Sequence, residues 1–130
     1  MASSSVHITY VELPAAQLDA TKAFYSSVFG WDWVDCGLTY AAHVDAHVEV
    51  GLNALALPAP AHEPGAENAI GPLVLFCTDA IDEVDGLIAP AGGQVVSPIY
   101  PYPGGRRFHF CDPSGNVLGV YQPHPSDVNQ

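Results

Sequence analysis

Two stretches of this sequence share one pattern of apolar residues and glycines, displaced by 63 positions. In each stretch, a strand-like run is followed by a segment with helical spacing and then by three further strand-like runs. The matching pairs are Val11 and Val74, Leu13 and Phe76, Leu18 and Ile81, Thr21 and Val84, Phe24 and Leu87, and Gly30 and Gly93. Agreement at six positions that are expected to face the core or to end a helix, under one unbroken offset, predicts two copies of a βαβββ unit.

The 130 residues are enough for one sizeable core, so we expect a single domain, 1–130, built from both units. The expected first module, 6–57, has strands at 6–13, 31–35, 38–43 and 48–57. Its helix runs from Leu18 to a stop at Gly30, with Asp19 as the candidate N-cap. A proline-rich linker is expected at 58–72. The expected second module, 73–122, has a helix at 79–89 and strands at 73–78, 94–99, 106–111 and 117–122.

The last two expected strands are joined by the sequence DPSGN, residues 112–116. Asp112 can accept hydrogen bonds from backbone N–H groups two or three residues further on. Pro113 presets φ for the second position of a turn, and Gly115 can adopt a positive φ. The sequence therefore predicts a tight turn that closes a hairpin.

The formal net charge is −11, from 14 acidic residues against Lys22, Arg106 and Arg107. Such a charge repels a phosphate backbone, so we expect no nucleic-acid partner and no anionic membrane surface. The sequence has no apolar run long enough to span a membrane and no secretory signal, which predicts a cytoplasmic protein. Three cysteines, Cys36, Cys77 and Cys111, are expected to be reduced core residues.

Three motifs together resemble the vicinal oxygen chelate superfamily, which includes glyoxalase I, bleomycin-resistance proteins and extradiol dioxygenases. These motifs are FYSSVFGW at 24–31, AGG at 91–93 and DPSGN at 112–116, and the resemblance covers residues 6–122. It implies an α+β fold in which two βαβββ modules form a curled mixed sheet around a cleft, with the helices outside. Many members dimerise, so the resemblance also implies a homodimer.

Metal-dependent members of this superfamily hold a divalent ion in the cleft, typically with His and Glu side chains. Counting from the motifs, the matching positions here are Tyr10, Leu73, Gly119 and a fourth position near Ala56. None of these residues is an ordinary metal ligand. The resemblance therefore implies no cofactor at the family's position, and divalent metal binding through displaced ligands is the alternative.

The expected ligand-binding residues are Tyr10, Glu12, Glu49, Tyr102, Arg107, His109 and Tyr121. Glu12 and His109 are the candidates for acid–base catalysis, although His109 could face either the cleft or the helices. The segment from Tyr100 to Gly105 is expected to be a loop. It could act as a lid that stacks on a planar ligand and offers Arg106 or Arg107 to an anionic group, or it could only protect a sheet edge. His43 and His47 are expected at the surface beside a hairpin turn.

The favoured function is metal-independent binding of a small, partly apolar molecule in the cleft between the modules, similar to drug-sequestering bleomycin-resistance proteins. One alternative is a metal-dependent lyase, isomerase or dioxygenase of the glyoxalase type that uses Glu12, Glu49 and His109 as displaced ligands. A second is a metal-free enzyme in which Glu12 or His109 moves a proton next to a carbonyl group. A third is a non-catalytic interaction module.

Overall fold

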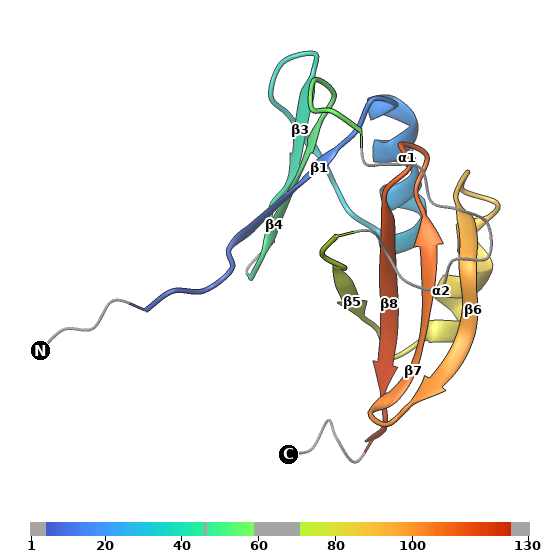
Figure 1. Ribbon diagram of the computed structural model, residues 1–130. Helices are drawn as coiled ribbons and strands as arrows, with labels where there is room; N and C mark the ends of the chain where they lie inside the picture. The colour runs from blue at the N-terminus through green and yellow to red at the C-terminus, as the bar shows by residue number, and fades with distance from the viewer. Residues whose placement is uncertain (1–4, 46, 59–70, 126–130) are drawn as a thin grey trace, which may run out of the picture.

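The computed structural model describes residues 5–45, 47–58 and 71–125, and most of the predicted linker lies outside these ranges. Two βαβββ units follow one another along the chain (Figure 1). The first unit consists of β1 (Tyr10–Pro14), α1 (Leu18–Phe29), β2 (Val34–Asp35), β3 (Tyr40–His43) and β4 (Glu49–Asn53). The second unit consists of β5 (Leu75–Cys77), α2 (Ile81–Ile88), β6 (Gln94–Tyr102), β7 (Gly105–Cys111) and β8 (Val117–Pro123). The predicted α+β fold of two modules is confirmed.

Each unit forms its own four-stranded mixed sheet, with strand orders β1-β4-β3-β2 and β5-β8-β7-β6. The first strand of each unit runs parallel to the last, and the remaining pairs are antiparallel. Figure 1 shows the first sheet set at an angle to the second, with α1 near both. Because β1 and β5 each stand at one end of their strand order, each has one edge without a neighbouring strand in its sheet.

The 63-residue offset holds for the first strand and helix of each unit and then changes. Helix α1 starts at Leu18 and α2 at Ile81, 63 positions later. The strand register pairs Glu12 with Gly51 in the first sheet and Leu75 with Gly119 in the second. Position 51 is therefore equivalent to position 119, an offset of 68. The expected equivalence near Ala56 is wrong because the long β6–β7 hairpin inserts residues into the second unit.

Helix α1 presents Thr21, Phe24, Tyr25 and Val28 as its buried residues. It ends at Gly30, whose φ of 72° is the left-handed conformation that glycine adopts at low cost. Asp19 was expected as the N-cap, but this position is taken by Gln17, which makes no side-chain capping bond. The Gln17 backbone N–H instead donates to the Ser114 hydroxyl at 3.1 Å, so the second unit caps the helix of the first.

One apolar core joins the two units and their helices. The first sheet contributes the face that packs against α1, and the second contributes the face that packs against α2. The buried apolar residues are Leu13, Ala15, Phe24, Tyr25, Val28, Val50, Leu52, Ile81, Ile88, Phe108, Phe110, Leu118 and Val120. We call the opposite faces, which are turned away from this core, the first open face (β1, β4, β3 and β2) and the second open face (β5, β8, β7 and β6).

The DPSGN turn forms as predicted and connects the two units. The Asp112 carboxylate accepts hydrogen bonds from the backbone N–H groups of Ser114 at 2.9 Å and Asn116 at 3.0 Å. Asn116 also donates from its side chain to the Pro14 carbonyl at the end of β1, at 2.8 Å. The turn therefore ties the last hairpin of the second unit to the first strand of the first.

Two expectations about local structure are wrong. Residues Tyr100 to Tyr102 belong to strand β6, which turns tightly into β7 at Pro103 and Gly104, so there is no loop long enough for a lid. Strand β6 lies at the edge of its sheet, where prolines are tolerated because the missing N–H faces outward. The cysteines are free, as expected, but Cys36 and Cys77 are exposed and Cys111 is half-buried. No helix in the described part of the chain is long and apolar enough to cross a membrane.

Candidate functional site

The first open face carries a hydrogen-bonded cluster of polar side chains. Residues paired across neighbouring strands share a face, which places Tyr10, Glu12, Tyr40, Gly51 and Asn53 together. The hydroxyls of Tyr10 and Tyr40 are hydrogen-bonded to each other. Asn53 donates from its side chain to Glu12 at 3.3 Å. Burial and hydrogen bonds to Tyr10 and Glu12 raise the pKa of Tyr40 well above its usual value.

Gly51 makes the tyrosine pair possible. A Cβ at this position would lie 2.0 Å from the Tyr40 hydroxyl oxygen and 2.4 Å from that of Tyr10. Any side chain would therefore displace the two hydroxyls from the middle of the sheet. Tyr10 and Glu12 were expected from the sequence and Tyr40 was not, because only the β3–β4 register brings Tyr40 to the same face.

The second open face presents rows of side chains across four strands. One row contains Tyr100 on β6, Arg107 on β7, Tyr121 on β8 and Cys77 on β5, since the register pairs these residues in turn. A hydrogen bond to Cys77 raises the pKa of the Tyr121 hydroxyl, and the negative charge of the ionised Cys77 sulfur, burial and Tyr102 act in the same direction. The row is therefore aromatic and polar, with one permanent positive charge in the middle.

His109 lies on the second open face, whereas its neighbours Phe108 and Phe110 enter the core. Of the two orientations expected from the sequence, the histidine therefore takes the one that faces away from the helices. It is 3% exposed, and its Nε2 atom lies 3.3 Å from the Tyr100 hydroxyl. The Nε–H group of Arg107 donates to the same hydroxyl. Tyr100, which was expected in a loop, therefore links the histidine to the arginine.

Gly119 occupies the position where metal-dependent relatives were expected to carry a ligand. A Cβ there would lie 2.4 Å from the Leu75 Cδ2 atom and 3.2 Å from the His109 Cδ2 atom. The side chains of these two neighbours therefore occupy the space above the glycine. Within residues 5–45, 47–58 and 71–125, no three His, Cys, Asp or Glu side chains gather closely enough to hold a metal ion. Glu12 and Glu49 lie on the first sheet and His109 on the second.

The structure divides the seven predicted ligand-binding residues into two groups. Three lie on the first open face and four on the second. The first group is Tyr10, Glu12 and Glu49, and the second is Tyr102, Arg107, His109 and Tyr121. Their role in binding stays a prediction.

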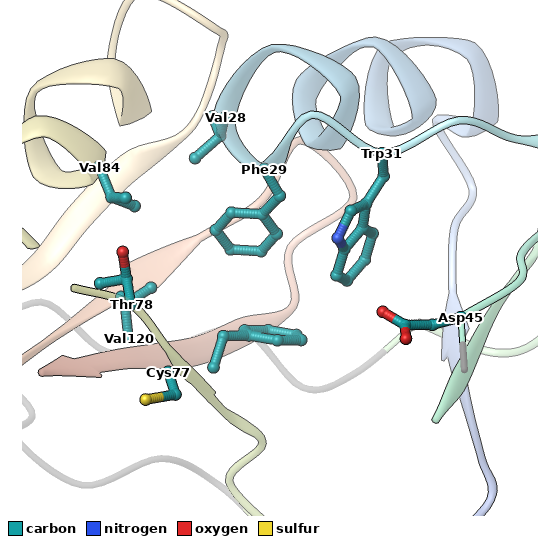
Figure 2. Close-up of a pocket in the computed structure, with 9 residues that line it drawn as sticks. Val28, Phe29, Trp31, Asp45, Cys77, Thr78, Val84 and Val120 are labelled. Atoms are coloured by element: carbon teal, nitrogen blue, oxygen red, sulfur yellow. The ribbon is translucent and has the colours of Figure 1, made fainter. Parts of the chain in front are cut away.

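A separate pocket of about 430 Å³ lies on the helix side of the second sheet. In Figure 2, Phe29 and Trp31 extend from the end of α1 towards it, and Asp45 lies beyond Trp31, on the side away from Val84. Val84 of α2 and Val120 of β8 complete its apolar wall. None of the seven predicted ligand-binding residues lines this pocket. No sequence motif indicates this pocket, because its walls come from segments that only the tertiary fold brings together.

His43 packs against Trp31 on the aromatic side of the pocket. The sequence predicted a surface imidazole at this position, and this prediction is wrong because the side chain is mostly buried. Its ring stacks on Trp31 with centroids 4.4 Å apart and planes 7° from parallel. Its Nδ1 atom lies 3.0 Å from the Asp32 carbonyl oxygen, and Nε2 lies 3.9 Å from the Asp45 carboxylate. The histidine therefore holds Trp31 in a fixed orientation beside the pocket.

Comparisons with known proteins agree with this architecture. Two curated proteins of Mycobacterium bovis and Mycobacterium tuberculosis, both named "Putative glyoxylase CFP32", are 31% identical over 116 residues, which is 87% of this chain. The chain spans 44% of the length of these relatives.

Two solved structures share the fold at lower identity. A glyoxalase/bleomycin resistance protein/dioxygenase family enzyme from Burkholderia phytofirmans superimposes with a TM-score of 0.72 at 20% identity, covering 92% of this chain and all of that one. TnmS3, an antibiotic binding protein from Streptomyces, gives a TM-score of 0.69 at 23% identity over 95% of this chain and all of that one. The family model for the Glyoxalase/Bleomycin resistance protein/Dioxygenase superfamily matches residues 7–120. The chain therefore belongs to this superfamily, as the three motifs indicated.

Proposed function

We propose that this protein binds a small, partly apolar molecule on its open sheet faces, without a metal ion at the family's usual positions. The observation that carries the proposal is the placement of its tyrosines. Five of the six lie on the two open faces, and only Tyr25 belongs to the core. Tyrosines offer flat apolar area together with a hydroxyl at low entropic cost, which suits recognition of ligands with rings and polar groups.

The side chains at the family's ligand positions support a metal-free site. Tyr10 engages its hydroxyl with Tyr40, and Leu75 and His109 cover Gly119. An ion at these positions would have to displace packed side chains and would gain no carboxylate or imidazole at either residue. TnmS3, whose fold this chain shares, is an antibiotic binding protein, which makes antibiotic-sized molecules reasonable first ligands to test.

We further propose that the binding form is a homodimer. Each open face is turned away from the shared core, so one chain does not enclose a ligand between its two faces. A second copy could place its second open face over the first open face of its partner. Val6 and Ile8, which precede β1, are 96% and 74% exposed and offer apolar area for such an interface. Sedimentation velocity at micromolar concentration should give a dimer, and Ile8→Asp should shift it towards monomer.

Ligand binding can be tested by thermal shift with antibiotics and other ring-containing small molecules, because a ligand that binds only the folded state must raise the melting temperature. For any compound that raises it, Tyr40→Phe and Tyr102→Phe probe the first and second open faces, and Val84→Leu probes the separate pocket. The proposal expects affinity to fall for at least one tyrosine variant and not for Val84→Leu. Loss of binding only in Val84→Leu would assign the ligand to the helix-side pocket and contradict the proposal.

Buried His109, on the same face and 3.3 Å from the Tyr100 hydroxyl, favours one second candidate, a metal-free enzyme that moves a proton next to a carbonyl group. Such an enzyme would exchange the α-proton of a bound carbonyl compound with D2O, which NMR detects directly. His109→Gln should abolish the exchange while the variant stays folded. Unchanged exchange in a folded variant would remove His109 from any catalytic role.

A further inference from the structure

The chain has three lysine and arginine side chains, and two of them are neutralised by carboxylates. Lys22 pairs with Asp35, and Arg106 pairs with Asp82 through both terminal nitrogens, at 3.4 and 3.1 Å. Among the described residues, Arg107 has no carboxylate within 4 Å. This is unexpected in a chain with 14 acidic residues, where a cation has many possible partners.

Arg107 is instead held by aromatic side chains. Its Nε–H donates to the Tyr100 hydroxyl, and its guanidinium carbon lies 5.5 Å from the centroid of the Tyr100 ring and 5.9 Å from that of Tyr102. A guanidinium carries five N–H donors, so this arrangement uses one of them and fixes the plane of the group. Within the described part of the chain, the N–H groups on Nη1 and Nη2 meet no acceptor.

The two arginines are neighbours in sequence but lie on opposite faces of β7. Arg106 points to the helix side, towards Asp82 of α2, and Arg107 points to the second open face between Tyr100 and Tyr121. An arginine oriented by aromatic rings, with both terminal nitrogens unused, is arranged to bind a planar anion through two parallel hydrogen bonds. The net charge of −11 disfavours multiply charged anions, so a single carboxylate suits this position better than a phosphate dianion.

We infer that the second open face selects ligands that carry a carboxylate, which pairs with Arg107, joined to an aromatic body, which lies against Tyr102 and Tyr121. This inference rests on the proposed function and names the class of ligand for one of its two faces. It is not what the overall charge suggests, since an acidic protein attracts cations at long range. The pairing of a carboxylate with Arg107 acts at contact distance, so it determines which ligands bind tightly to this face.

Three probes with one aromatic body separate charge from apolar burial: 2-naphthoate, the neutral 2-naphthamide and the cationic 2-naphthylmethylammonium. Binding is followed by NMR on ¹⁵N-labelled protein, because the chain has only two arginines and therefore two side-chain Nε–H signals to assign. The inference expects 2-naphthoate to shift the Arg107 Nε–H signal and to bind at least tenfold more tightly than either other probe. Arg107→Gln should weaken 2-naphthoate binding about tenfold or more.

Arg106→Gln is the matched control, because it removes the neighbouring charge from the other face and should leave 2-naphthoate binding within about twofold. Arg107→Lys keeps the charge and loses the planar pair of donors, so binding should fall in this variant too. If all three probes bind the second open face equally, the carboxylate inference is wrong and the proposed function stands. If none of the three probes shifts any signal from this face, the carboxylate inference and the proposed function are both contradicted for the second open face. The wild-type spectra alone decide between these outcomes, even if a variant fails to fold.

Discussion

The Tyr25 hydroxyl donates a hydrogen bond of 2.8 Å to the Asp112 carboxylate, across 87 residues of sequence. Tyr25 lies on α1 of the first unit and Asp112 begins the last turn of the second, and both are buried. Burial raises the pKa of Tyr25 well above its usual value, and the adjacent carboxylate raises it further. This pair therefore joins FYSSVFGW and DPSGN, two of the three motifs that resemble the superfamily.

Replacing Tyr25 with Phe should lower the free energy of unfolding by about 1.5–3 kcal/mol, because a hydrogen bond to a buried carboxylate is lost and its acceptor is left with fewer donors. Urea unfolding followed by tryptophan fluorescence measures the change. Tyr102→Phe, at the half-exposed end of β6, is the control and should stay within about 0.5 kcal/mol. Equal effects in both variants would show that the Tyr25–Asp112 bond adds nothing beyond the packing of the ring.

The carboxyl group of Asp112 should contribute more to the free energy of unfolding in mild acid than at neutral pH. Burial raises the pKa of its carboxyl above the ordinary value of 3.8, although hydrogen bonds from Asn116 and Tyr25 oppose the shift. Between the unfolded and folded pKa values the folded state binds more protons, so this contribution to stability is complete below pH 3.8 and is lost as pH rises through the folded pKa. In urea titrations, wild type should therefore exceed Asp112→Asn by more at pH 4 than at pH 7. A difference that shrinks towards pH 4 would show that the hydrogen bonds outweigh burial.

Gly51 should be intolerant of even one added methyl group. Its Cβ would overlap the hydroxyl oxygens of Tyr40 and Tyr10, so Gly51→Ala should cost about 1–3 kcal/mol through forced movement of the tyrosine pair. Gly86 within α2 is the matched control, since a Cβ there meets nothing within 4 Å. Gly86→Ala should stabilise the protein by roughly 0.5–1 kcal/mol through its higher helix propensity. A neutral Gly51→Ala would mean that the tyrosines are free to move apart.

The sequence predicted those features of the fold that depend on local chemistry and on the repeat. Leu18 and Ile81 begin the two helices at the expected offset, Gly30 ends α1, and Asp112 organises the final turn. These positions are readable because capping, turn formation and apolar spacing act within a few residues. The motifs then identified the superfamily, and with it the two-module arrangement.

The features that the sequence did not predict depend on strand register and on the edges of the sheets. The equivalence of Gly51 and Gly119 was missed because the longer β6–β7 hairpin shifts the offset within the second unit. Tyr100 was assigned to a loop because the prolines around it normally end a strand, whereas β6 is an edge strand. The cluster of Tyr40 with Tyr10, and the pocket beside Trp31, arise from segments that are distant in sequence.

The most direct test of the central claim is the metal content of untagged protein purified without a chelator, combined with thermal shifts on adding Zn²⁺, Ni²⁺, Fe²⁺ and Mn²⁺. A metal that binds only the folded state must raise the melting temperature. The account predicts far less than one ion per chain and no rise with any of the four metals. About one tightly held ion per chain, with a matching rise in melting temperature, would contradict it. That result would favour the metal-dependent alternative, with Glu12, Glu49 and His109 as the first ligands to replace.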